Sequence, residues 1–197
     1  MEMAIDLFIT FWQWTLFGVL VVIGSILNYV FDGLPRERVG FTYKDMPHMK
    51  PVPILTKEKG FWGAIWLWIT STRKWVITQD WHYVVNGKKL VIPAGFEFDG
   101  ASVPKFLATF LSPVGVLLMG GLVHDYAYKY ASLKGTQKKP VIYEYDQKAA
   151  DELFRDICIE VNGFHLLNYL AYYSLRLVGF IAWNGHRKND VNAVGKS

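Results

Sequence analysis

The chain of 197 residues contains little cysteine and little charge. Its single cysteine, Cys158, excludes an intramolecular disulfide and a zinc site built from several cysteines, which suits a reducing compartment. Charged residues make up 19% of the chain and hydrophobic residues 52%, whereas roughly 25% of a typical soluble protein is charged. This composition excludes intrinsic disorder. The length predicts one functional core with an appendage.

Long basic runs are also missing. The formal net charge is only +4, and no block of Lys or Arg is long enough to follow a phosphate backbone, so we expect no nucleic-acid partner. The sequence has neither a phosphate-binding P-loop nor a dinucleotide-binding glycine motif. It also has no set of three or four ligands at the spacing of a zinc site. These absences exclude nucleotide-driven and zinc-dependent chemistry.

One long stretch carries no charge at all. Residues 7–31 are 25 uncharged residues between Asp6 and Asp32, and a helix of that length spans about 37 Å, more than the roughly 30 Å of a bilayer core. The run predicts a single transmembrane helix, because a cleaved signal peptide needs a basic start and a shorter apolar core. Four basic residues follow the run and none precedes it: Arg36, Arg38, Lys44 and Lys50. The positive-inside rule then predicts a single-pass membrane protein with a cytoplasmic C-terminal domain.

The rest of the chain predicts an α+β domain over residues 60–187. Prolines and mixed charge indicate an extended linker over 32–59. Two β-rich runs joined at Asn86-Gly87 predict a hairpin in a small antiparallel β-unit over 74–93. Helical spacing predicts a mainly helical part over 104–184, followed by a frayed tail over 188–197.

An aromatic segment precedes this β-unit. Residues 60–70 include Phe61, Trp62, Trp66 and Trp68 and are too few to span a bilayer. So dense a group of indoles next to Arg73 and Lys74 fits the protein core or a membrane interface equally well. The sequence leaves both interpretations open.

The residues best suited to chemistry lie at the end of an apolar run. On a helix, His124 and Asp125 point in adjacent directions, and Tyr128 returns to the face of His124 one turn later. A neutral imidazole can take a proton from water near pH 7, and a carboxylate can hold a hard cation. Asp151, on a second predicted helix, could orient the imidazole as the acid of a hydrolase dyad does. Alternatively, Asp151 pairs with Arg155 on one helix face and His124 is a structural histidine.

Four motifs in order carry a resemblance to a known family. They are residues 92–96 (IPAGF), 99–104 (DGASVP), 124–128 (HDYAY) and 150–154 (ADELF). The stretch 91–183 that contains them resembles an uncharacterised domain family found largely in phages and prophages. This resemblance implies a phage- or prophage-type protein, with phage or virion proteins among its partners and a location in the virion as one expectation.

The histidine motif and the aspartate motif also resemble the catalytic helices of phospholipase A₂, most closely the disulfide-free form in parvovirus capsid proteins. The resemblance implies paired helices on which His124 is the general base, Asp151 the acid of the dyad and Tyr128 its supporting tyrosine. It also implies calcium as cofactor, held by Asp125, and membrane lipid as substrate.

The calcium loop of that superfamily is not matched. Its nearest counterpart by position is residues 98–102, where Asp99 could bind the cation and Gly100 could bring carbonyl oxygens close. The same stretch could equally be a turn fixed by Pro104. Two functions therefore follow from the sequence: a calcium-dependent phospholipid acyl hydrolase, or a non-catalytic phage membrane or morphogenesis protein in which the same residues form a buried network.

Overall fold

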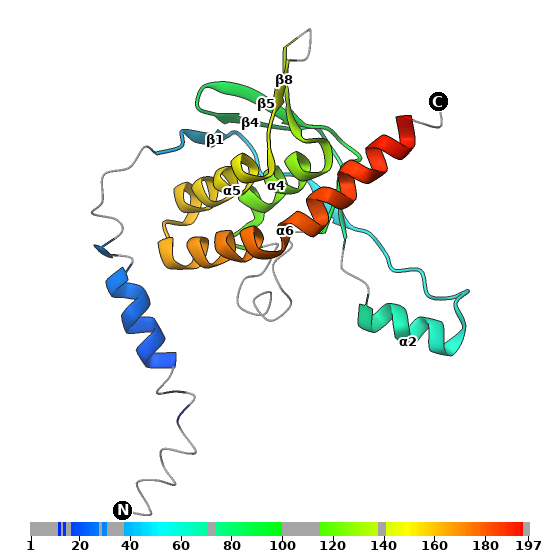
Figure 1. Cartoon of the computed structure of the whole chain (residues 1–197), viewed down its shortest axis with the longest axis horizontal. Coiled ribbons are helices and arrows are strands. Elements are labelled where there is room, and N and C mark those ends of the chain that lie inside the picture. The colour runs from blue at the N-terminus through cyan, green and yellow to red at the C-terminus, as the bar shows by residue number, and fades with distance from the viewer. Residues whose placement is uncertain are drawn as a thin grey trace, which may run out of the picture.

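The computed structural model describes residues 12, 14, 17–27, 29–30, 38–70, 74–99, 115–137 and 141–194. It is a mixed α+β structure in which two antiparallel sheets lie beside a group of helices (Figure 1). The five-stranded sheet has the order β1-β4-β5-β7-β8 and the three-stranded sheet the order β2-β3-β6.

The larger sheet is built around the hairpin at Asn86-Gly87. Its strands are β1 (Phe41–Tyr43), β4 (Trp81–Val85), β5 (Lys88–Ile92), β7 (Ser132–Gly135) and β8 (Ile142–Glu144). Val85 pairs with Lys88 across the two-residue turn, and Asn86 and Gly87 have φ values of 49° and 78°. Positive φ at both positions is what a type I′ turn requires, and this turn matches the twist of the two strands.

The smaller sheet consists of β2 (Met49–Pro51), β3 (Trp75–Ile77) and β6 (Glu97–Phe98). It draws on two segments that the sequence analysis assigned differently. The described part of the expected linker over 32–59 forms β1 and β2. The first β-rich run before Asn86-Gly87, residues 74–85, divides into β3 and β4, which lie in different sheets. Proline did not prevent strand formation because Pro51 ends an edge strand, where its missing N–H leaves no ladder bond unmade.

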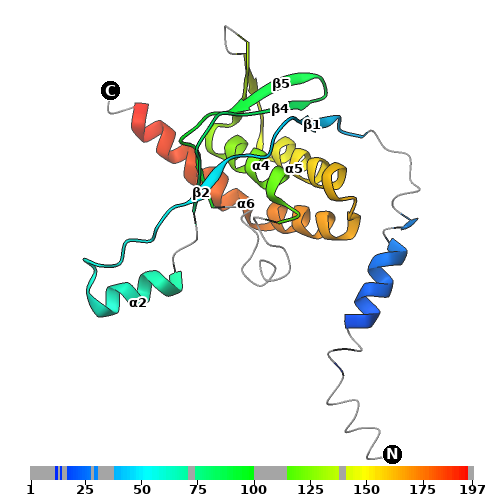
Figure 2. The ribbon, with the colours of Figure 1, turned by 180° about the vertical axis from the view of Figure 1, so that it is seen from behind.

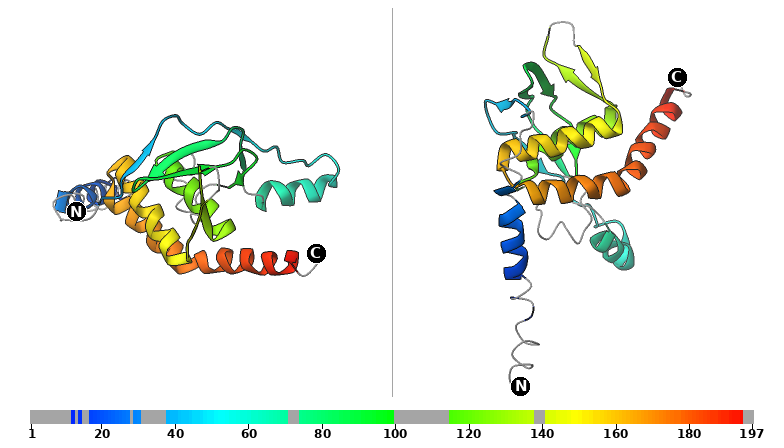
Figure 3. Two further views of the ribbon diagram at one scale, coloured as in Figure 1. Left: turned by 90° about the horizontal axis from the view of Figure 1, so that it is seen from above. Right: turned by 60° about the vertical axis from the view of Figure 1, so that its left-hand side comes forward.

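Three helices form the other layer: α4 (Leu118–Tyr130), α5 (Gln147–Asn162) and α6 (His165–Val194). The larger sheet lies on one side of α4 and α5, and α6 lies on the other (Figure 3). Asp146 caps α5 by accepting a hydrogen bond from the Ala149 N–H at 2.7 Å, and Gly163 ends it in the left-handed region. Helix α6 continues to Val194, so most of the expected frayed tail over 188–197 is helical. The predicted helical part over 104–184 begins among residues outside the described ranges.

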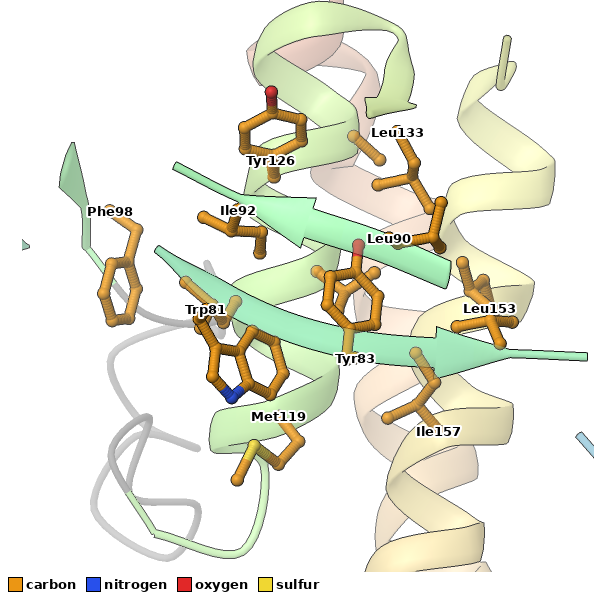
Figure 4. Close-up of a cluster of buried hydrophobic side chains, with 14 of the residues drawn as sticks. Trp81, Tyr83, Leu90, Ile92, Phe98, Met119, Tyr126, Leu133, Leu153 and Ile157 are labelled. Atoms are coloured by element: carbon orange, nitrogen blue, oxygen red, sulfur yellow. The ribbon is translucent and has the colours of Figure 1, made fainter. Parts of the chain in front are cut away.

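The core lies between β4 and β5 on one side and α4 and α5 on the other. Trp81 and Tyr83 alternate with exposed His82 along β4, as the period of a strand requires. Figure 4 shows the inward side chains of these strands facing Met119 of α4 and Ile157 of α5. Figure 2 shows the same arrangement from behind, with β4 and β5 running across α4 and α5. This packing fixes the positions of the two helices that carry the candidate site.

The transmembrane prediction is wrong. Within the part of the chain that the structure describes, no helix is long and apolar enough to cross a membrane. The absence of charge is not sufficient evidence for a membrane span, because crossing requires a helix that is both long and predominantly apolar. The prediction of a single-pass membrane protein is therefore wrong. The cytoplasmic orientation was inferred from the same helix and is withdrawn with it.

The aromatic segment forms the helix α2 (Gly60–Thr70), which stands away from the body of the molecule in every view (Figures 1, 2 and 3). None of its side chains described, over residues 60–67, is buried. Of the two interpretations left open by the sequence, the core is therefore excluded for these residues.

Candidate functional site

Helix α4 places its functional side chains as the helical spacing predicted. His124 is 1% exposed, and its ring lies against that of Tyr128 one turn later, with 4.0 Å between the ring centroids. Asp125, which points in the neighbouring direction, is 11% exposed. The polar end of α4 therefore enters the interior between α5 and α6.

A glycine allows α4 to approach α5 closely. A Cβ atom on Gly120 would overlap Cys158 Sγ and would lie 2.8 Å from the carbonyl oxygen of Phe154, closer than real Cβ atoms come. Only glycine fits at this crossing. His124, one turn further along α4, is thereby brought to Asp151 on α5.

Asp151 is the centre of the site. Its Oδ1 receives hydrogen bonds from His124 Nε2 at 2.9 Å and from the Tyr128 hydroxyl at 2.6 Å, and its Oδ2 receives one from Arg176 Nη1 at 2.8 Å. Burial by itself would raise the pKa of Asp151, but these three hydrogen bonds outweigh it and hold the pKa below its usual range. The carboxylate is therefore ionised, and it fixes the orientation of the His124 ring.

Arg176 on α6 is the site residue that the sequence analysis missed. Arg155, the expected partner of Asp151, instead contacts Asp156 through Nε at 2.7 Å. The sequence does contain a feature that points to Arg176 as a buried partner. It is the only Asp, Glu, Lys or Arg in residues 164–183. A charge in so apolar a helix needs a partner, and a buried carboxylate on the adjacent helix is the natural one.

The other nitrogen of His124 has no hydrogen-bond partner. Nδ1 lies 3.5 Å from Asp125 Oδ1 without making a hydrogen bond, and Asp125 Oδ2 is also buried without a partner. When Nε2–H donates to Asp151, Nδ1 carries a lone pair and can accept a proton. Nε2 is thus anchored by a hydrogen bond to Asp151, whereas Nδ1 lies only within ion-pair distance of Asp125.

His124 and Asp125 influence each other's protonation. Burial raises the pKa of Asp125 to about 7, against a smaller lowering by His124, and the charge of Asp99 adds to the increase. Burial would lower the pKa of His124, but its contacts with Asp125 and Asp151 outweigh this and raise the pKa. The pKa of each group is therefore raised above its ordinary value.

A cavity of about 240 Å³ lies beside the pair formed by His124 and Asp125. Asp99, Asp125 and Tyr128 contribute to its lining, and His124 does not. The remaining lining residues are Lys74, Glu97, Phe98, Lys129, Ala182 and His186. Of the predicted site residues, His124 and Asp151 are buried away from the cavity, Asp99 and Asp125 line it as the cavity group, and the buried Tyr128 contacts both sets. Gly100 lies outside the described residues.

The cavity group has part of the chemistry of a cation site. Carboxylate oxygens are the ligands that calcium prefers, and the buried, unpartnered Asp125 Oδ2 together with Asp99 matches this donor class. Over the described ranges, however, no group of three or more His, Cys, Asp or Glu side chains is placed to hold a metal ion. Asp99 and Asp125 therefore offer at most four carboxylate oxygens, fewer than the six to eight oxygen ligands that calcium takes.

A family model described as "Protein of unknown function (DUF1353)" matches residues 75–174, just over half of the chain. This span includes the larger part of both sheets, α4, α5 and the beginning of α6, and thus His124 and Asp151. No curated protein and no solved structure matches the chain. The prediction of an uncharacterised domain family is confirmed.

Proposed function

The chain belongs to the DUF1353 family of proteins of unknown function, and from its buried dyad we propose that it hydrolyses carboxylic esters with His124 as general base. The observation that carries this proposal is the asymmetry of the His124 ring. Nε2 is held by an ionised Asp151, whereas Nδ1 has no hydrogen-bond partner. A histidine that only stabilised the fold would gain by having both nitrogens satisfied.

In the proposed reaction, His124 Nδ1 takes a proton from a water molecule, whose oxygen attacks the ester carbonyl carbon. The imidazolium that forms is stabilised by Asp151, which stays ionised because Tyr128 and Arg176 hydrogen-bond to it. His124 then gives its proton to the departing alcohol oxygen as the carbon–oxygen bond breaks. The products are a carboxylic acid and an alcohol, and the base is regenerated.

A divalent cation would complete this chemistry. Asp125 and Asp99 are the residues that would hold it, and when bound it supplies positive charge near the oxyanion. The resemblance of the histidine and aspartate motifs to phospholipase A₂ supports phospholipid as the ester and calcium as the cation. The cavity lining also includes Lys74 and Lys129, which could contact an anionic phosphate group on the substrate, next to the carboxyl groups of Glu97, Asp99 and Asp125.

The second candidate is a non-catalytic role in phage morphogenesis. The observation that favours it is that His124 is 1% exposed and does not line the cavity. In this case the contacts from α4 and α6 to Asp151 form a buried polar network that specifies the packing of three helices.

The test compares the parent, His124→Asn and the control His82→Asn, which changes an exposed histidine on β4. Asparagine cannot take a proton from water, so release of fatty acid from mixed phospholipid micelles should fall about a hundredfold or more in His124→Asn and stay unchanged in the control. Each protein is assayed with calcium and with a chelator, and its thermal unfolding is recorded. If the parent releases no fatty acid under either condition and His124→Asn loses on the order of 1–3 kcal/mol of stability, the non-catalytic role stands.

A further inference from the structure

Helix α2 carries large aromatic side chains that are mostly exposed. Phe61, Trp62 and Trp66 are 72%, 78% and 68% exposed, and Leu55 in the preceding loop is 78% exposed. We call these four residues the α2 surface. Single exposed apolar residues are ordinary, but a contiguous group of large ones marks a surface that binds something.

Such a helix is unfavourable when it is surrounded by water. It has 11 residues, and helices of this length are marginal in isolation unless an apolar face is packed. Its side chains are apolar around the whole circumference, a pattern typical of helices with cover on every side. The helix therefore needs an occupant on its exposed faces.

The charges next to α2 indicate what that occupant is. Lys57 and Lys59 precede the helix and Lys74 follows it, and all three are exposed. Glu58 is the only acidic residue among 54–74. In a symmetric dimer through this surface the lysines would be brought towards one another, whereas an anionic surface attracts all three.

The chemistry of the side chains agrees with a lipid surface. Indole rings concentrate at the headgroup level of a bilayer because they are apolar with one polar N–H, and each nearby lysine adds attraction to anionic headgroups. A helix of 11 residues spans about 16 Å, so it can lie in one interface but cannot cross the bilayer. We propose that the α2 surface binds the surface of a bilayer that contains anionic lipid.

This surface is connected to the candidate site through Lys74. That residue follows α2 in the sequence and also contributes to the lining of the cavity beside Asp125. The docking proposal goes beyond ester hydrolysis and does not depend on it, because binding and hydrolysis are measured separately.

The experiment is flotation of the purified full-length protein with vesicles of phosphatidylcholine, with and without phosphatidylglycerol. We expect the parent to float with the vesicles that contain phosphatidylglycerol, and less so at high salt, because salt screens the lysines. The double variant Phe61→Ser/Trp62→Ser should bind at least about tenfold more weakly, since it removes two large apolar contacts. The matched control is Ile142→Ser in β8, which is 64% exposed and lies on the opposite side of the molecule from α2 (Figure 1).

A second variant makes the result independent of the aromatic residues. Lys57→Gln/Lys59→Gln should lose the enhancement by phosphatidylglycerol while its melting temperature stays that of the parent, because both side chains are exposed. The proposal is overturned if the parent floats with neither kind of vesicle, or if the α2 variants float as well as the parent. It is also overturned if the aromatic variant merely converts a concentration-dependent dimer into a monomer. Hydrolysis of a soluble short-chain ester by the same proteins reports on the dyad alone, so failure of docking and failure of catalysis are distinguishable.

Discussion

Arg176 is the residue on which the charge balance of the dyad depends. It reaches from α6 to Asp151 Oδ2, the oxygen that neither His124 nor Tyr128 contacts. A buried carboxylate is costly unless its oxygens are satisfied, and one strong charge-assisted hydrogen bond offsets much of that cost. The guanidinium of Arg176 on α6 therefore helps to keep Asp151 ionised, together with the hydrogen bonds from His124 and Tyr128 on α4.

Replacing Arg176 with Met should lower the free energy of unfolding by about 1–3 kcal/mol at pH 7, because Asp151 Oδ2 loses its partner. Arg176→Lys, which keeps the charge, should lose less. The pKa of Asp151 is lowered in the folded protein, so this stabilisation is present above the ordinary pKa of Asp and disappears as the pH falls through the folded value. Urea unfolding at pH 7 and under acidic conditions measures both effects. Equal stability of all three proteins at pH 7 would contradict this role.

The contribution of Asp125 to the free energy of unfolding depends on pH in the opposite direction from that of Asp151. Its pKa is raised from 3.8 to about 7 in the folded protein, so folding favours the protonated form and stability decreases as the pH rises between these values. A buried carboxylate oxygen without a hydrogen-bond partner lowers the stability of the folded protein.

Asp125→Asn should therefore unfold at higher urea concentration than the parent at pH 8, with a gain on the order of 1–3 kcal/mol. The difference should shrink towards pH 4, where the parent carboxyl is protonated. The same substitution should abolish any calcium-dependent increase in the melting temperature of the parent. A variant that is less stable than the parent at pH 8 would show that the carboxylate has a favourable partner.

At the scale of elements, the crossing of α4 and α5 determines whether the dyad forms. Gly120→Ala places a methyl group against Cys158 Sγ and the Phe154 carbonyl oxygen, so the helices must separate. Overpacking of this kind typically costs about 1–3 kcal/mol. The control is Gly185→Ala on α6, where the added Cβ meets nothing within 4 Å and higher helix propensity should stabilise by about 0.5–1 kcal/mol.

Thermal unfolding distinguishes these two substitutions by the sign of the change in melting temperature. Gly120→Ala should also weaken the contact between His124 and Asp151, which NMR titration of the histidine would detect as a shift towards a lower pKa. An unchanged melting temperature in Gly120→Ala would mean that Cys158 gives way at little cost and that the close crossing is not required.

At the scale of the whole molecule, α6 holds the site together at two places. Arg176 contacts Asp151 on α5, and Arg187 Nη2 donates to the carbonyl oxygens of Tyr128 and Lys129 at the end of α4, at 3.0 and 2.6 Å. Carbonyl groups in the last turn of a helix have no partner within the helix, so a cation there both satisfies them and interacts favourably with the helix dipole.

Two truncations separate this contact from the rest of the C-terminal segment. A chain that ends after Arg187 should unfold at nearly the same urea concentration as the full chain. A chain that ends after Gly185 should lose about 1–3 kcal/mol more, because two charge-assisted hydrogen bonds are removed. If both truncated chains lose the same amount, the stabilisation arises from helix length and not from Arg187.

The sequence determined the local features of this protein. The hairpin at Asn86-Gly87 and the helices that contain His124 and Asp151 follow from turn chemistry and helical period, which depend on neighbouring residues. Prediction from the sequence failed where one pattern is compatible with several structures. An uncharged run was interpreted as a membrane span, and a segment with several prolines as a linker.

Tertiary structure decided which distant groups meet. The assignment of residues 74–85 to two sheets, the choice of Arg176 over Arg155 as partner of Asp151, and the exposure of α2 all depend on how the sheets and helices pack. None of these is encoded by spacing along the chain, because a strand or a charged side chain is equally able to pair with several partners. Burial selected among them: Asp151, once enclosed between α4 and α6, requires the one guanidinium that reaches it.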